Sequence, residues 1–134
     1  MSKGITILGI DPGTNVTGYG IIKADDQTIE VVAIGVLELE KYDDHYQKIF
    51  KIHERTMQLI DQFHPDEFAI EAPFYGKNAQ SMIKLGRAQG VAIAAALSRN
   101  LPIFEYAPRK VKISVTGNGA ACKEQVAGML ESIL

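Results

Sequence analysis

The sequence lacks the features that would place the chain in a membrane or in an oxidising compartment. Its single cysteine, Cys122, allows no disulfide within the chain, and we interpret it as a small buried hydrophobe. No apolar run approaches the roughly 18 residues needed to span a bilayer. The start, "MSKGITILGIDPG", has an apolar stretch too short for a signal peptide. We therefore predict a cytoplasmic protein of one domain, because 134 residues are enough for a hydrophobic core.

Charge is distributed unevenly along the chain, although the net charge is only −2. Residues 1–76 carry six Lys/Arg and 13 Asp/Glu, whereas residues 77–134 carry eight Lys/Arg and three Asp/Glu. The stretch from Lys77 to Asn100 has four basic residues and no acid. This asymmetry indicates either an anionic partner for the C-terminal half or a solvated basic surface.

Three segments near the N-terminus have the apolar composition of β-strands. Residues 5–10 form a near-continuous apolar run, as a fully buried strand does. Residues 18–24 and 29–40 follow short turns, and the second of them ends in alternating apolar and polar residues. These segments predict an antiparallel meander of three strands.

Beyond the meander, helical and strand patterns alternate. Asp43 or Asp44 is placed to cap the first helix, and Pro65 to end it. Alternation of this kind favours parallel crossovers, so we predict a mixed α/β sheet with helices over its faces. The expected elements are helix 44–63, strand 68–71, helix 79–100, strand 101–107, a helical turn in 108–115 and a last helix over 121–134.

Two of the predicted strands end on a carboxylate. Asp11 follows the first strand and precedes a Pro-Gly turn, and Glu71 ends the strand 68–71. Ligand sites in open α/β sheets form outside the carboxyl ends of strands. If the two strands are neighbours, the carboxylates lie close together and supply oxygen ligands of the type that suits Mg²⁺ or Mn²⁺. A pair of such ions there would suit phosphodiester cleavage. The alternative is that each acid is only a turn residue or a helix cap.

Four longer segments carry a family resemblance. They are "LGIDPGTNVTGYGII", "FAIEAPFYGKNAQSMIKLGRAQGVAIAAA", "LPIFEYAPRKVK" and "TGNGAACKEQV". Together they resemble the RuvC family of bacterial Holliday junction resolvases over essentially all 134 residues. The resemblance implies a ribonuclease H-like fold, whose five-stranded sheet has the order 3-2-1-4-5 with strand 2 antiparallel. It also implies a Mg²⁺-dependent endonuclease, with Mn²⁺ as a substitute and up to two ions per active site.

The resemblance assigns roles to individual residues and partners. Asp11 and Glu71 match catalytic metal ligands, and Lys112 and Lys123 match catalytic basic residues near the scissile phosphate. The resemblance further implies four-way junction DNA as substrate, a homodimer that makes two symmetric nicks, and the RuvAB branch-migration motor as partner. It implies no membrane and no nucleotide cofactor. The residues expected to contact DNA are Phe74, Asn78, Ser81, Arg109, Lys110, Lys112, Thr116 and Lys123.

Two glycines in the second predicted helix would allow a close helix contact, and a contact between two copies of the chain is one hypothesis. Gly86 and Gly90 are four residues apart, which permits close packing either against a second chain or against the sheet. Lys84, Arg87 and Arg99 do not all fall on one face of this helix, so they do not form a single binding stripe.

The family carries two further acids near its C-terminus, and this sequence has no matching motif. Beyond Glu71 the acids are Glu105, Glu124 and Glu131, and none has a matching context. We therefore expect a single ribonuclease H-like domain over 1–134 that lacks the end of its last helix. Such a truncated or proteolysed chain would fold but cleave poorly.

Three other functions remain open at this point. An actin-like ATPase or sugar kinase also begins with a strand, an Asp and a "GT" turn, although those proteins need two domains around the nucleotide. A truncated chain would act as a non-catalytic junction-binding module. A related enzyme of the same fold would act on RNA. Phe74 and the basic stretch 109–123 favour the junction enzyme over the RNA enzyme.

Overall fold

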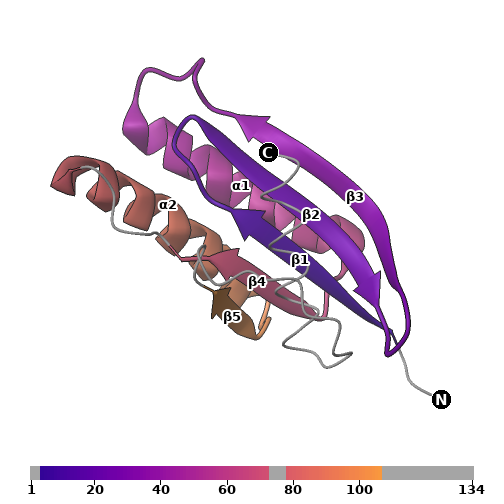
Figure 1. Ribbon diagram of the computed structural model, residues 1–134. Helices are drawn as coiled ribbons and strands as arrows, with labels where there is room; N and C mark the ends of the chain where they lie inside the picture. The colour runs from indigo at the N-terminus through magenta and orange to yellow at the C-terminus, as the bar shows by residue number, and fades with distance from the viewer. Residues whose placement is uncertain (1–3, 73–77, 107–134) are drawn as a thin grey trace.

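The computed structural model describes residues 4–72 and 78–106 of the chain (Figure 1). These residues form five strands and two helices, in an order that matches the alternation expected from the sequence. The elements are β1 (Ile5–Asp11), β2 (Val16–Ala24), β3 (Ile29–Glu38), α1 (His45–Phe63), β4 (Glu67–Glu71), α2 (Ala79–Ser98) and β5 (Ile103–Tyr106).

The strands form one mixed sheet with the order β3-β2-β1-β4-β5. Strand β2 pairs antiparallel with both β1 and β3, whereas β1 pairs parallel with β4, and β4 with β5. Parallel neighbours need a crossover connection, and α1 and α2 lie within the two connections that lead into β4 and β5. The predicted sheet order, with strand 2 antiparallel, is confirmed.

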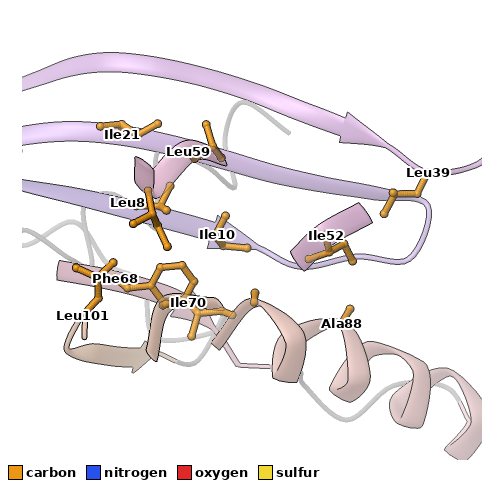
Figure 2. Close-up of a cluster of buried hydrophobic side chains, with 13 residues drawn as sticks. Leu8, Ile10, Ile21, Leu39, Ile52, Leu59, Phe68, Ile70, Ala88 and Leu101 are labelled. Atoms are coloured by element: carbon orange, nitrogen blue, oxygen red, sulfur yellow. The ribbon is translucent and has the colours of Figure 1, made fainter. Parts of the chain in front are cut away.

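Both helices pack on the same face of the sheet. Leu8 and Ile10 of β1 and Phe68 and Ile70 of β4 belong to one buried cluster with residues of α1 and α2 (Figure 2). The alternate residues of the same strands point to the opposite face, as the pleat requires, and Ile7 and Ala69 join a second cluster there. The helices α1 and α2 therefore cover one face of the sheet, and the second cluster lies on the opposite face.

Capping residues set the ends of the helices. Asp44 caps α1, and its side chain accepts a hydrogen bond from the Tyr46 amide. At the other end, His64 adopts a left-handed conformation (φ 49°), and its amide donates to the Ile60 carbonyl. Pro65 follows directly and cannot continue the helix. Asn78 caps α2 by accepting from the Ser81 amide at 2.8 Å.

Several predicted ends differ from the structure by one or two residues, and a physical reason is visible for two of them. The third strand was expected to reach residue 40, but β3 ends at Glu38, because the Leu39 amide donates to the Asn15 carbonyl at 2.8 Å and the Leu39 side chain is buried. Helix α2 ends at Ser98 rather than at residue 100, and Asn100 turns the chain with a φ of 60°. The elements predicted over 108–134 lie outside the described residues.

Within residues 4–72 and 78–106, neither helix is long and apolar enough to cross a membrane.

Candidate active site

The two candidate metal ligands end neighbouring parallel strands. Ile10 of β1 is registered with Ile70 of β4, and Asp11 and Glu71 are the next residue on each strand. Paired strands lie roughly 4.8 Å apart, so the two residues start side by side at the carboxyl edge of the sheet. The condition on which the paired site depended, that the two strands be neighbours, is therefore met.

Asp11 and Glu71 also share one face of the sheet. Because side chains alternate along a strand, Asp11 lies on the same face as Ile7, and Glu71 on the same face as Ala69. This is the face opposite to α1 and α2. Asp11 is half-buried, and Glu71 is only 8% exposed.

The turn after Asp11 is tightly held. The Gly13 amide donates to the Thr17 hydroxyl at 3.2 Å, and that hydroxyl donates to the Gly13 carbonyl at 2.8 Å. A side chain at residue 13 would collide with the carbonyl oxygen of Val16, so only glycine fits this close approach. The "DPGT" sequence thus turns the backbone sharply into β2 and leaves Asp11 at the edge of the sheet.

The donors at this edge suit one hard divalent cation. Two carboxylates held side by side repel each other unless a cation lies between them or one is protonated. Carboxylate oxygens are the protein ligands that Mg²⁺ and Mn²⁺ prefer, with water completing the coordination. Among the described residues, no cluster of three or more His, Cys, Asp or Glu offers a fuller metal site.

The structure describes only part of the predicted DNA-contacting set. Asn78 lies at the start of α2, and its side-chain oxygen is used as the helix cap, which leaves its amide NH₂ available as a donor. Ser81 is exposed in the first turn of α2. The other predicted residues lie outside the described residues, and they are Phe74, Arg109, Lys110, Lys112, Thr116 and Lys123.

One group of residues near this edge was not found from the sequence. Lys48 of α1 donates to the side-chain oxygen of Asn15, which lies in the turn after Asp11, at 3.4 Å. Lys84 and Arg87 of α2 lie close enough to His45 of α1 to disfavour its charged form. These side chains are far apart in the sequence, so no spacing rule could have grouped them.

Comparison with known proteins decides the family. Residues 7–134 match the family described as Crossover junction endodeoxyribonuclease RuvC. The chain belongs to the RuvC family. A relative of that description from Christiangramia forsetii is 61% identical over 128 residues, which are 96% of this chain and 67% of the relative. One from Cytophaga hutchinsonii is 62% identical over 128 residues, which are 96% of this chain and 64% of the relative. The chain thus spans about two thirds of the length of these relatives.

Solved RuvC structures have the same fold. The Thermus thermophilus RuvC structure superposes with a TM-score of 0.73 and 22% identity, covering 92% of this chain and 81% of that one. T. thermophilus RuvC in complex with a Holliday junction substrate gives a TM-score of 0.72 and 24% identity, covering 81% of this chain and 68% of that one. The ribonuclease H-like fold expected from the sequence is therefore confirmed, and membership of this nuclease family implies dependence on a divalent metal. The expectation that this chain is truncated and poorly active stays a prediction.

Proposed function

We propose that this chain is a Mg²⁺-dependent endonuclease that nicks four-way DNA junctions, with Asp11 and Glu71 as its metal ligands. Family membership supports the reaction class. The observation that carries the proposal for this chain is the pairing of β1 with β4, which ends both strands on a carboxylate at the same edge and on the same face.

The chain's own residues would do three things in this reaction. Asp11 and Glu71 would hold the cation, and the buried position of Glu71 would fix its carboxylate in place. Gly13 and Thr17 would hold the turn so that Asp11 stays at the edge. When bound, Mg²⁺, with Mn²⁺ as a substitute, supplies Lewis-acid and water-activating chemistry for hydrolysis of a phosphodiester. Up to two ions per site would require ligands beyond these two carboxylates.

The proposal is tested by incubating the chain with a four-way junction and with a duplex of the same sequence. We expect slow symmetric nicking of the junction when Mg²⁺ is present, no cleavage in excess chelator, and less cleavage of the duplex than of the junction. Strong junction binding without cleavage at any Mg²⁺ or Mn²⁺ concentration would instead identify a non-catalytic binding module. Absence of both binding and cleavage would contradict the proposal altogether.

We also propose that the chain forms a homodimer through the outer surface of α1 and α2. Both helices expose large apolar side chains. Ile83 and Leu97 of α2 are each 55% exposed, and Tyr46 and Phe50 of α1 are 66% and 59% exposed. Ile83, Gly90 and Leu97 are seven residues apart and so follow one stripe of the helix. A two-fold dimer through this surface would supply the two active sites that paired nicks require.

Substituting Gly90→Leu tests the dimer without harming the subunit. A Cβ atom at residue 90 meets no atom within 4 Å, and leucine is a better helix former than glycine, so the subunit should stay folded. At a close helix contact between copies, the added side chain would clash. We expect the solution mass to fall from dimer to monomer, measured by light scattering. The exposed Gln62→Leu on α1 is the control and should leave the mass unchanged; a dimeric Gly90→Leu protein would refute this interface.

The remaining partners follow from the resemblance. We propose that the dimer works with the RuvAB branch-migration motor in the bacterial cytoplasm, and needs no nucleotide cofactor of its own. Co-migration of the chain with RuvAB on junction DNA would support this, whereas independent binding of the two would not.

A further inference from the structure

Three cations gather around one imidazole where α1 and α2 begin. His45 is the first residue of α1, Lys48 follows one turn later, and Lys84 and Arg87 come from α2. Burial lowers the pKa of His45, and the positive charges of Arg87, Lys84 and Lys48 lower it further, while Asp44 opposes them. All three cations therefore lie within electrostatic range of the His45 ring.

These cations lack a carboxylate partner in the part of the chain that the structure describes. Lys84 and Arg87 make no ion pair or hydrogen bond among residues 4–72 and 78–106, and Lys48 donates only to the neutral amide of Asn15. The carboxylate facing His45, Asp44, is already engaged as the cap of α1. By contrast, Arg99 at the other end of α2 pairs with Asp61 at 2.8 Å. Within these residues, the three cations at the start of the helix pair are thus offset only in part, by Asp44, whereas Arg99 at the other end is paired.

That end is the edge where the two strand carboxylates lie. Helix α2 runs back from the carboxyl end of β4 to the start of β5, so its first turns lie at the carboxyl edge of the sheet (Figure 1). The Lys48–Asn15 hydrogen bond ties α1 to the turn that follows Asp11. The carboxylates occupy one face of this edge, and the cations occupy the helix-covered face.

We propose that Lys48, Lys84 and Arg87 bind a backbone phosphate of a DNA strand that crosses this edge, at a position separate from the scissile phosphate. Lys84 and Arg87 are three residues apart and so project from the same side of α2. Lysine and arginine are the side chains that neutralise DNA phosphates, and such contacts set the position of the protein on its substrate without reading sequence. The three residues are therefore positioning residues, and the inference rests on the proposed junction substrate.

The test is the salt dependence of junction binding, measured by fluorescence anisotropy in chelator so that no strand is cut. Each phosphate contact contributes about −0.9 to the slope of log K against log salt. The Lys84→Ala/Arg87→Ala variant should bind about tenfold more weakly or worse, with a slope shallower by about one to two over about 50–200 mM salt. Lys23→Ala, which removes one exposed charge near the opposite edge, should leave the slope unchanged.

Failure of this inference differs from failure of the proposed function. If the unmodified chain does not bind junctions, the proposed function fails. If the unmodified chain binds junctions, but the double variant has the same slope of log K against log salt as Lys23→Ala, the cation site is refuted. Solution mass is measured in parallel, and should Arg87→Ala alter it, Lys84→Ala and Lys48→Ala take over the test. Each of them should then make the slope shallower by about 0.9, and an unchanged slope in both would refute the site.

A second readout does not depend on affinity. A phosphate among the three cations favours the protonated imidazole, so saturation with a short DNA duplex should raise the pKa of His45, followed by NMR of the ring proton. His53 and His64 serve as internal references. The same rise should be absent in the double variant. A His45 titration that DNA leaves unchanged in the unmodified chain would overturn the placement of the phosphate.

Discussion

Replacing Asp11 with asparagine should lower the rate of junction cleavage by about 10³-fold or more, because it removes a metal ligand worth several kcal/mol to the transition state. Junction binding should survive, since asparagine keeps the shape of the side chain and removes a charge that repels phosphate. Single-turnover measurements with enzyme in excess resolve even slow cleavage. Glu71→Gln should behave in the same way, because the two carboxylates start side by side.

The matched control is Asp26→Asn, which removes the same charge from the exposed turn between β2 and β3. This substitution should leave both the cleavage rate and the binding unchanged. If Asp11→Asn cleaved junctions at the rate of Asp26→Asn, the carboxylate at the end of β1 would have no catalytic role.

Replacing Phe68 with alanine should lower the free energy of unfolding by about 3–5 kcal/mol, because it leaves a large cavity. Phe68 is completely buried in β4 and belongs to the cluster that joins β1 to both helices (Figure 2). Since Glu71 lies three residues further along the same strand, the cavity should also loosen the candidate metal site. Chemical denaturation followed by circular dichroism measures the change.

The control for Phe68→Ala is Val32→Ala, at the register irregularity of the edge strand β3, where the side chain is 40% exposed. We expect a change of about 0.5 kcal/mol or less for this substitution. Equal losses at the two positions would mean that the core is not centred on β4.

The apolar pattern predicted most of the fold because burial dictates it. The continuous run of β1 and the helical spacing of α1 mark segments that must be covered, and Asp44 and Pro65 mark the ends of α1. The end of β3 was wrong because alternation continues through Leu39 and Glu40. What stops the strand is the hydrogen bond from Leu39 to Asn15, a contact between residues distant in the sequence.

The sequence could predict the features of the candidate site that depend on one strand at a time. Asp11 and Glu71 each end an apolar run, which is visible in the sequence, but the face they share depends on the register of β1 with β4. The cations around His45 come from two helices, and only their packing brings them together. Another such tertiary contact is the ring of Tyr19, which covers Gly35 and receives a hydrogen bond from Arg55.

The central claim is that Asp11 and Glu71 form one divalent-metal site. Calorimetric titration with Mn²⁺ in the absence of DNA tests it most directly, because the readout does not require cleavage. We predict that the unmodified chain and Asp26→Asn bind Mn²⁺ alike, and that Asp11→Asn and Glu71→Gln each lose that binding. Unchanged Mn²⁺ binding in both Asp11→Asn and Glu71→Gln would contradict the claim.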